Sequence, residues 1–289
     1  MTSVYISNES IQVVVGTKSG GRMKISQILT GSVGDGCVIG GVITDENMLR
    51  DRLASFWKAN RLPVSGLRLV IESSSVSTKL LTLPNVRGNY LADLVKESFT
   101  ELETDEAVYD YAVIGAGGDG GLSVIGCMTE SSFIRGYVRL FESAGLKLGS
   151  VGLAVCGQLR MAQFCRELKN SSYILAVLDK NIVSQFLFIE GEYRFSKRQR
   201  MIYDRETPEL TDEVSGMIST LIQFKKSENI AAEINNVYLC GFSDTEISSI
   251  SLIIGDMNIS GMTDLTDVIC PEKDKAKLSD CVLALGGLF

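Results

Sequence analysis

The sequence of 289 residues contains no histidine. This absence excludes Ser-His-Asp and Cys-His catalysis and removes the commonest zinc ligand, so any chemistry must come from carboxylates, lysines or backbone amides. The seven cysteines are scattered and form no Cys-x-x-Cys pair. Most of them have apolar neighbours, which predicts small core residues in a reducing compartment.

Long apolar runs and basic clusters are also lacking. No uninterrupted apolar stretch approaches the roughly 20 residues that cross a bilayer, and the first residues lack the pattern of a signal peptide. The net charge of −7 argues against a nucleic-acid partner, because binding to the phosphate backbone needs a clustered basic face. The densest basic stretch, residues 197–200, is predicted to be a solvated strand edge. The sequence therefore predicts a cytoplasmic protein.

Phosphate-binding motifs with fixed glycine spacing are absent as well. Residues 30–41 are rich in glycine, but they match neither the P-loop nor the dinucleotide-binding pattern. We therefore expect this stretch to be a linker.

Two stretches of similar pattern stand out. Residues 4–29 predict three antiparallel strands, with a polar corner at residues 7–10 between the first two. Residues 173–199 predict a second set of three strands, in which Asp179 stands at the tip of the first hairpin. Such a duplication is the plan of the actin and hexokinase superfamily.

Between the two sets, residues 42–145 alternate helices and strands and are predicted to form a self-contained α+β subdomain inserted in the first lobe. One of its helices is expected over residues 90–102. The other expected parts are, in order, the first lobe at 1–41 and 146–170, a reduced second lobe at 171–280, and a C-terminal helix at 281–289 that packs on the first lobe.

These features resemble the PilM-like actin-fold proteins that assemble bacterial type IV pili. The resemblance covers nearly the whole chain in the right order and rests on these segments: Gly41-Val42-Ile43, the helix from Leu49, the strands to Leu83-Pro84, Val108-Tyr109-Asp110-Tyr111, residues 144–168, Gly191 with Arg194–Arg198, and the run from Ala284 to Leu288. It implies an α/β, actin-like (ribonuclease-H-like) fold of duplicated lobes with an inserted α+β subdomain.

In such proteins ATP lies between the lobes, where two acidic-Ile-Gly turns and a Gly-Gly turn approach it closely. All three turns depart from that pattern here. The first is Tyr5-Ile6-Ser7, with Gln12 where a lysine is usual, and the second keeps Asp179 but continues with Lys180-Asn181. The third has Phe242 after Gly241, and we expect its ring to crowd the base.

The resemblance therefore implies a degenerate nucleotide cleft. Its residues are Ser7, Ser10, Gln12, Asp179, Asn181 and Gly241. We expect no catalysis and no cofactor, and ATP with Mg²⁺ is disfavoured. A turn-capping carboxylate is the alternative interpretation of Asp179.

The function implied by the resemblance is a cytoplasmic scaffold of a type IV pilus or pseudopilus machine, at the inner face of the cell membrane. Its partner is the N-terminal cytoplasmic tail of a single-pass inner-membrane protein, and contact with the membrane comes through that partner. The tail is expected in a groove between the inserted subdomain and the first lobe, near residues 67–83 and 90–102. The sequence leaves a homo-oligomer open.

Two alternatives remain. A weak ATPase or small-molecule kinase of the same superfamily would use Asp179 as a Mg²⁺ anchor or general base. A cell-division-type actin relative would be expected to carry an amphipathic membrane helix beyond Phe289.

Overall fold

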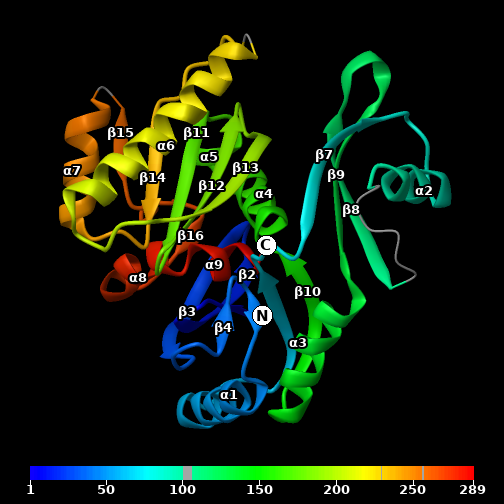
Figure 1. The fold of residues 1–289 in the computed structure, drawn as a ribbon, viewed down its shortest axis with the longest axis vertical. Helices are drawn as coiled ribbons and strands as arrows, with labels where there is room; N and C mark the ends of the chain where they lie inside the picture. Colours follow the sequence, from blue (N-terminus) through cyan, green and yellow to red (C-terminus); the bar gives the residue numbers. More distant parts are fainter. Residues whose placement is uncertain (100–105, 229, 256) are drawn as a thin grey trace.

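The structure is a computed structural model that describes residues 1–99, 106–228, 230–255 and 257–289. Its strands form a six-stranded sheet, a five-stranded sheet, a three-stranded sheet and a two-stranded hairpin. Figure 1 shows the two large sheets packed together and the three-stranded sheet standing to their right. We call the parts built on the six-stranded and five-stranded sheets the first and second lobes, and the three-stranded sheet with its helix the small subdomain.

The first lobe is built on a sheet with the strand order β10-β6-β1-β2-β3-β16. Consecutive strands β1, β2 and β3 are antiparallel, whereas β6 runs parallel to β1, β10 to β6, and β16 to β3. β1 is buried along its whole length, as expected for a strand covered on both faces. The strands are β1 (Thr2–Ile6), β2 (Ser10–Ser19), β3 (Arg22–Ser32), β6 (Ser65–Ile71), β10 (Lys147–Leu153) and β16 (Val268–Ile269).

Helices cover both faces of this sheet. α1 (Glu46–Asn60) and α3 (Ser131–Ser143) share one apolar core with the strands, in which Trp57 is buried. On the other face, α4 (Ala154–Phe164) and α9 (Val282–Gly286) pack against each other, and α9 contacts β1 and β2. The C-terminal helix therefore belongs to the first lobe.

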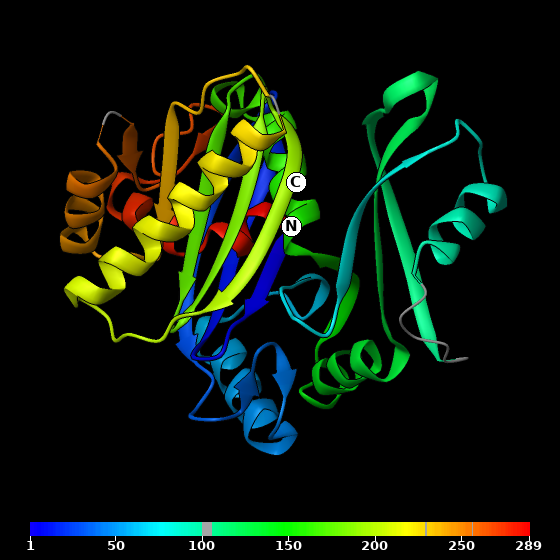
Figure 2. The same ribbon diagram turned by 45° about the horizontal axis from the view of Figure 1, so that its top comes forward.

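The second lobe has the strand order β13-β12-β11-β14-β15. β11, β12 and β13 are the three antiparallel strands predicted over residues 173–199. One face of the sheet is covered by α6 and α7, and Figure 2 shows α6 lying across it. The elements are β11 (Tyr173–Asp179), β12 (Ile182–Ile189), β13 (Glu192–Arg200), β14 (Asn236–Cys240), β15 (Asn258–Ser260), α6 (Pro208–Ser227) and α7 (Asp244–Ile254).

The two lobes share one apolar core. Leu175 and Phe186, on the inner face of the second sheet, belong to the same cluster as Leu159 of α4 and Leu285 of α9. The short helices α5 (Arg166–Lys169) and α8 (Lys275–Asp280) border this core. Because the lobes are joined by buried apolar surface, they form a continuous body.

The small subdomain is smaller than the predicted insertion at 42–145. β6 pairs with β1, and α1 and α3 pack on the first sheet, so these segments belong to the first lobe. In this region the sequence pattern predicts alternating helices and strands, but it does not show which strands pair with strands far away in the chain. The part that stands apart comprises β7 (Ser77–Leu83), α2 (Asn89–Glu97), β8 (Ala107–Ala116) and β9 (Leu122–Glu130).

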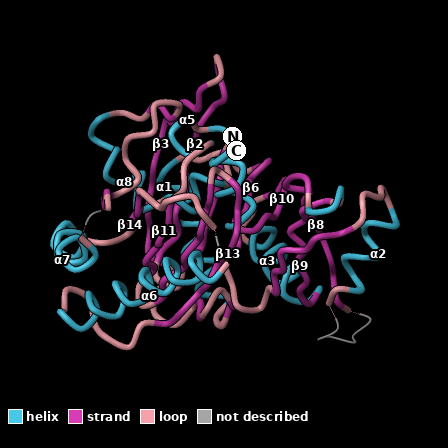
Figure 3. The backbone as a smooth tube through the Cα atoms, turned by 90° about the horizontal axis from the view of Figure 1, so that it is seen from above, coloured by secondary structure: helices cyan, strands magenta, loops and turns pink. Residues whose placement is uncertain are grey.

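Figure 3 shows α2 on the outer side of the small sheet, away from the lobes. It begins one residue before the predicted helix over 90–102 and ends at Glu97, and residues 100–102 of that prediction lie outside the described residues. Leu91 and Val95 of α2 pack on one face of the sheet. The opposite face is therefore the one turned toward the lobes.

Two other boundaries differ from the prediction. The second lobe does not extend to residue 280, because β16 returns to the first sheet and pairs with β3. Residues 30–41 are not simply a linker, since β3 continues to Ser32 and β4 (Val38–Ile39) pairs with β5 (Val42–Ile43). Both segments form strands through pairing that local composition does not reveal.

Candidate functional site

The corner between β1 and β2 is held by the Ser7 side chain. Its Oγ accepts hydrogen bonds from the backbone N–H groups of Glu9 (3.1 Å) and Ser10 (2.8 Å), and it lies 3.1 Å from the Ser10 Oγ. A serine that accepts from the N–H groups two and three residues ahead stabilises a tight turn. Two amides of this predicted phosphate loop are therefore bonded within the loop itself.

The two lobes meet directly at Asp179, the last residue of β11. The Tyr5 hydroxyl donates a hydrogen bond to Asp179 Oδ2 over 3.2 Å, and Tyr5 is buried. Burial raises the pKa of Asp179, while hydrogen bonds from Ser7, Tyr5 and the Asn8 backbone, and the charge of Arg198, act against this rise. Tyr5 stands at the position where the sequence resemblance leads us to expect an acidic residue, and its hydroxyl bonds the acid of the other lobe.

An ion pair spans the lobes beside this hydrogen bond. Lys180 Nζ lies 3.0 Å from Glu9 Oε1, and both side chains are about half exposed. Such a pair contributes only about 0–1 kcal/mol. Its position is more informative, because it joins the turn of the second hairpin to the corner of the first.

The other predicted cleft residues lie around the same place. Gln12 donates to the Ser10 Oγ over 3.4 Å, and its Oε1 is buried with no partner among the described residues. Asn181 completes the turn between β11 and β12. Gly241 directly follows β14 with φ of 78°, and a Cβ there would stand 2.3 Å from the Leu178 carbonyl oxygen. Glycine is required at this point because β14 approaches β11 closely.

Phe242 does not crowd the cleft as predicted, because its side chain is buried in the core of the second lobe. Ser7, Ser10, Gln12 and Asp179 are joined by hydrogen bonds among themselves. Asn181 instead accepts from the Met201 N–H, and Gly241 lies against Leu178. Asp179 is the carboxylate that could hold a cation there, and within the described ranges no three His, Cys, Asp or Glu side chains are grouped to bind a metal.

The sequence interpretation missed a second contact between the lobes, around Glu72. The Ser184 hydroxyl donates to Glu72 Oε1 over 3.1 Å. Burial raises the pKa of Glu72, whereas the charge of Arg198 and the Ser184 hydrogen bond act against the rise. Arg198 pairs with Ser184 across β12 and β13, so both side chains lie on one face of the sheet.

The prediction that residues 197–200 form a solvated strand edge is therefore only partly correct. β13 is an edge strand, as expected, but Arg198 is partly buried and its Nη1 lies 3.5 Å from the Gly40 carbonyl oxygen. The alternation of side chains along β13 could have predicted that Arg198 lies on the inner face of the second sheet. The sequence does not show, however, that the first lobe lies against that face.

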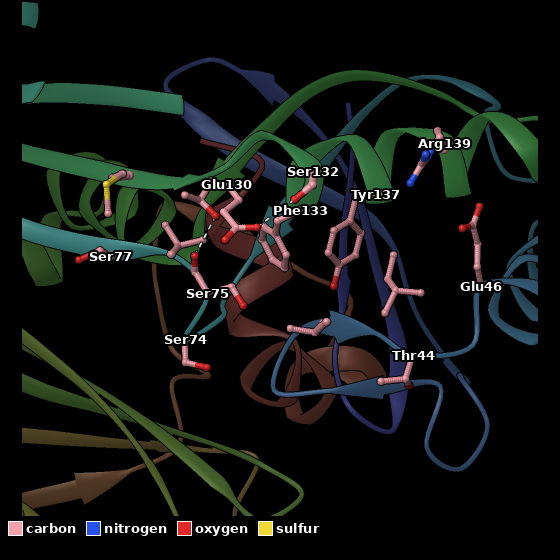
Figure 4. A pocket seen from close by; sticks show the side chains of 16 residues that line it. Thr44, Glu46, Ser74, Ser75, Ser77, Glu130, Ser132, Phe133, Tyr137 and Arg139 are labelled. Atoms are coloured by element: carbon pink, nitrogen blue, oxygen red, sulfur yellow. Dashed lines mark hydrogen bonds between the residues drawn. The ribbon is translucent and has the colours of Figure 1, made fainter. Parts of the chain in front are cut away.

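A groove of about 1010 Å³ opens between the first lobe and the small subdomain, and we call it the α3 groove. Figure 4 shows Phe133 and Tyr137 of α3 side by side in it, with their ring centroids 5.6 Å apart. Other apolar side chains in its lining are Val42, Ile43, Val76 and Met128. Hydroxyl groups come from Thr44, Ser74, Ser75, Ser77, Thr129 and Ser132, and charges from Glu46, Glu130 and Arg139.

The α3 groove reaches the edge of the small sheet. β7 is an edge strand in the order β7-β9-β8, and Ser77 at its start lines the groove. Val76 and Thr129 also line a second cavity of about 430 Å³, between the small sheet and β10 with α4. An edge strand beside apolar pockets can bind an extended peptide as an added strand.

A groove lies between the first lobe and the small subdomain, as expected, and the binding of a tail in it stays a prediction. The segment between β6 and β7, which falls within residues 67–83, lines the α3 groove. α2, which stands for the predicted helix 90–102, packs on the other face of the small sheet and contributes to neither cavity.

Gly40 and Gly41 connect the α3 groove to the contacts between the lobes. The Gly40 N–H donates to Asn8 Oδ1 over 2.8 Å, and its carbonyl accepts from the Ser73 hydroxyl over 2.9 Å. The Gly41 carbonyl accepts from the buried Tyr137 hydroxyl over 2.7 Å, on the groove wall. Two consecutive residues are therefore bonded both to the corner of the first hairpin and to the groove.

No protein-family model and no curated protein matches the sequence. Among solved structures, a PilM–PilN type IV pilus biogenesis complex matches with a TM-score of 0.78 at 13% identity, over 99% of this chain and 97% of that chain. A Bacteroides thetaiotaomicron protein with an actin-like ATPase fold and unknown function matches with a TM-score of 0.55 at 12% identity, over 99% and 94%. The chain has the actin-like fold.

A third solved structure similar to this chain is the ethanolamine utilization protein EutJ from Carboxydothermus hydrogenoformans. It matches with a TM-score of 0.51 at 11% identity, over 98% of this chain and 88% of that chain. At these identities the likeness concerns the fold. The predicted actin-like architecture, and the resemblance to PilM-like proteins at the level of that architecture, are confirmed. None of the described helices of this actin-like chain is long and apolar enough to cross a membrane.

Proposed function

We propose that this chain is a cytoplasmic scaffold of a type IV pilus or pseudopilus assembly machine, at the inner face of the cell membrane. In this proposal, the α3 groove binds the N-terminal cytoplasmic tail of a single-pass inner-membrane protein. The observation that carries it is the open groove of about 1010 Å³ beside the edge strand β7. The likeness to a PilM–PilN complex over nearly the full chain supports the choice of machine.

The lining of the α3 groove fits a tail of mixed apolar and basic character. Val42, which is 40% exposed, and Phe133, which is partly buried, offer apolar contacts for side chains on one face of an extended peptide. Glu46 and Glu130 outnumber Arg139, which favours a cationic segment. Cytoplasmic segments next to a membrane helix carry an excess of Lys and Arg, so the charge of such a tail complements the groove.

The interlobe contacts support a scaffold that does not hydrolyse ATP. Tyr5 bonds Asp179, and Lys180 pairs with Glu9, so groups of the two predicted phosphate loops bind each other. A nucleotide that entered between them would have to break both contacts. This cost opposes tight binding.

The test is a titration of labelled peptides, read by fluorescence anisotropy. The peptides span the N-terminal cytoplasmic tails of single-pass inner-membrane pilus and secretion proteins from the same organism. Gly136 lies on α3 in the groove lining, and a Cβ there would meet open space, so Gly136→Leu fills the groove without a backbone clash. We expect this variant to weaken the binding of a tail by about tenfold or more, which corresponds to about 1.4 kcal/mol.

Gly216→Leu is the matched control, because Gly216 is also a helical glycine with open space around its Cβ position, but it lies on α6 in the second lobe. The control is expected to bind like the unmodified chain. Failure of every tail to bind, or equal binding by the Gly136→Leu variant, would contradict the proposal.

A second candidate function is weak ATP binding by an ATPase or kinase of the same fold. The observation that favours it is the Asp179 carboxylate, which stands at the turn of the second hairpin where the lobes meet. A thermal-shift measurement, described in the Discussion, separates it from the scaffold function.

A further inference from the structure

A further solvent-accessible pocket lies at the β2–β3 hairpin, away from the α3 groove. It has a volume of about 630 Å³, and we call it the hairpin pocket. Its lining includes Gly20, Gly21, Arg22, Lys24, Phe164 and Arg166. The proposed scaffold function makes no use of it.

The hairpin pocket concentrates positive charge in a chain whose net charge is −7. Residues 10–34 contain Lys18, Arg22 and Lys24 and no acidic residue. Arg22 and Lys24 are exposed and lie on the same face of β3, since the buried Met23 between them points to the other face. Two cations therefore stand side by side at the pocket wall.

Arg166 adds a third cation that is held in a fixed position. Its Nε and Nη2 donate to the Asp267 carboxylate, with the shortest distance 2.8 Å, and its backbone N–H donates to the same group over 2.9 Å. The Asp267 side chain is buried, whereas Arg166 remains 70% exposed. A guanidinium has five N–H donors, so the Nη1 donors remain available among the described contacts.

A fourth cation lies at the rim, and the neighbouring acid is already engaged. Lys18 Nζ lies 4.8 Å from the centroid of the Phe164 ring, which lines the pocket. Asp267 is the acidic residue of the lining, and its charge is offset by Arg166. Glu167 is close by and accepts hydrogen bonds from the backbone N–H and hydroxyl of Thr266, which leave its negative charge in place. Four cations, Lys18, Arg22, Lys24 and Arg166, stand against two acids, Asp267 and Glu167, so two positive charges remain in excess.

The remaining walls are apolar. Phe164 and Ile269 line the pocket, and Ile269 pairs with Lys24 in the sheet, so cations and apolar surface face the same space. The volume exceeds what a bare inorganic anion occupies, which leaves room for an organic group against these side chains. Clustered Arg and Lys side chains match the charge and geometry of a phosphate group.

We propose that the hairpin pocket binds a phosphate group carried by an organic molecule. Arg22, Lys24 and Arg166 contact the phosphate, and Phe164 packs against the organic part. The phosphate belongs either to an anionic phospholipid headgroup or to a soluble phosphate ester. Both present the same chemistry to the pocket.

The test compares the unmodified chain with the Arg22→Ala/Lys24→Ala double variant, which leaves the Arg166–Asp267 pair intact. A double variant at Lys58 and Lys226 is the matched control, because it removes the same charge from exposed positions on α1 and α6. The first readout is the melting temperature with inorganic phosphate against chloride at equal ionic strength. Phosphate stabilises many proteins weakly by exclusion from their surface, so the informative quantity is the difference between variants.

We expect phosphate, at about ten times its Kd, to raise the melting temperature of the unmodified chain and of the control by a few degrees more than that of the double variant. The second readout is co-sedimentation with phosphatidylglycerol vesicles, with phosphatidylcholine vesicles as comparison. Vesicle binding that is lost in the double variant assigns the phosphate to a lipid. A phosphate-dependent shift without vesicle binding assigns it to a soluble ester.

Equal phosphate shifts in all three chains together with no vesicle binding would overturn the proposal. Vesicle binding retained by the double variant would overturn it as well. Neither outcome affects the α3 groove, whose test uses peptides and a different set of variants.

Discussion

Tyr5 and Asp179 join the two lobes through a hydrogen bond of 3.2 Å between the phenol hydroxyl and the carboxylate. Tyr5 lies on β1, the strand between β2 and β6 in the first sheet, and Asp179 ends β11 of the second sheet. Two carboxylates facing each other at such a distance would repel and would need a cation between them. With tyrosine at this position the hydroxyl bonds the carboxylate directly, so this contact between the lobes needs no cation.

The first prediction concerns this bond. Tyr5→Phe keeps the ring in the core but removes the donor to a partly buried carboxylate, so we expect a loss of about 1–2 kcal/mol in the free energy of unfolding. Urea denaturation measures it. Tyr90→Phe is the control, because Tyr90 is 77% exposed on α2, and it should change stability little. Equal stability of the Tyr5→Phe variant and the unmodified chain would show that the bond contributes nothing.

The second prediction concerns the pH dependence of stability. Burial raises the pKa of Asp179 in the folded chain above its usual value. Between the usual and the raised pKa the folded state binds more protons than the unfolded state, so this residue makes stability fall as pH rises through that window. Asp179→Asn cannot ionise, so the stability of the variant relative to the unmodified chain should increase across the window and then level off.

Urea denaturation at a series of acidic to neutral pH values measures this difference. Glu72, whose pKa is also raised by burial, is present in both chains and largely cancels in the comparison. Asp212→Asn, at an exposed position on α6, controls for the loss of a surface charge. A relative stability of Asp179→Asn that decreases with rising pH would contradict the assigned cause.

Much of the local structure could be predicted from the sequence. The helix from Glu46 is capped by Asp45, whose Oδ1 accepts from the Met48 N–H over 2.9 Å, and the helix after Ser243 has a full capping box. These signals lie within four residues of each other, so a single sequence contains them. The two sets of antiparallel strands follow for the same reason, since each is joined by short turns.

The features that the sequence did not reveal depend on residues far apart in the chain. β16 adds to β3 across more than two hundred positions, and β6 adds to β1 across the intervening elements β2 to β5 and α1. The bonds of Tyr5 to Asp179 and of Arg198 to Gly40 likewise join distant segments. The six predicted cleft residues were placed by resemblance, and the sequence could not show that the loops would bond to each other. Phe242 was misplaced because its burial in the second lobe depends on how α6 and α7 pack.

The third prediction tests nucleotide binding. Because the predicted phosphate loops are held by Tyr5–Asp179 and Lys180–Glu9 contacts, we expect millimolar Mg-ATP to leave the melting temperature unchanged. A ligand that binds only the folded state would raise it in proportion to ln(1 + [L]/Kd). A rise of several degrees that is lost in Asp179→Ala would contradict the closed-cleft interpretation and favour nucleotide control of assembly.

The fourth prediction concerns the link between the interlobe corner and the α3 groove. Asn8 does not line the groove, but its Oδ1 accepts the Gly40 N–H, and the next residue, Gly41, is bonded to Tyr137 on the groove wall. Asn8→Ala removes the acceptor of the Gly40 N–H and leaves Gly40 held at its carbonyl alone, so we expect it to weaken the binding of a tail peptide by about fivefold, which corresponds to a coupling of about 1 kcal/mol. Anisotropy titration measures the effect.

Asn47→Ala on α1 is the matched control, because Asn47 is exposed and accepts a hydrogen bond from Arg50 outside this link. The double variant Asn8→Ala/Tyr137→Phe then tests the route. If Gly40 and Gly41 transmit the effect, the second substitution adds less to the loss of affinity than it does alone, because the link is already broken. Strict additivity of the two losses would show that Asn8 and Tyr137 act independently. Unchanged affinity in Asn8→Ala would show that the groove keeps its shape without the interlobe corner.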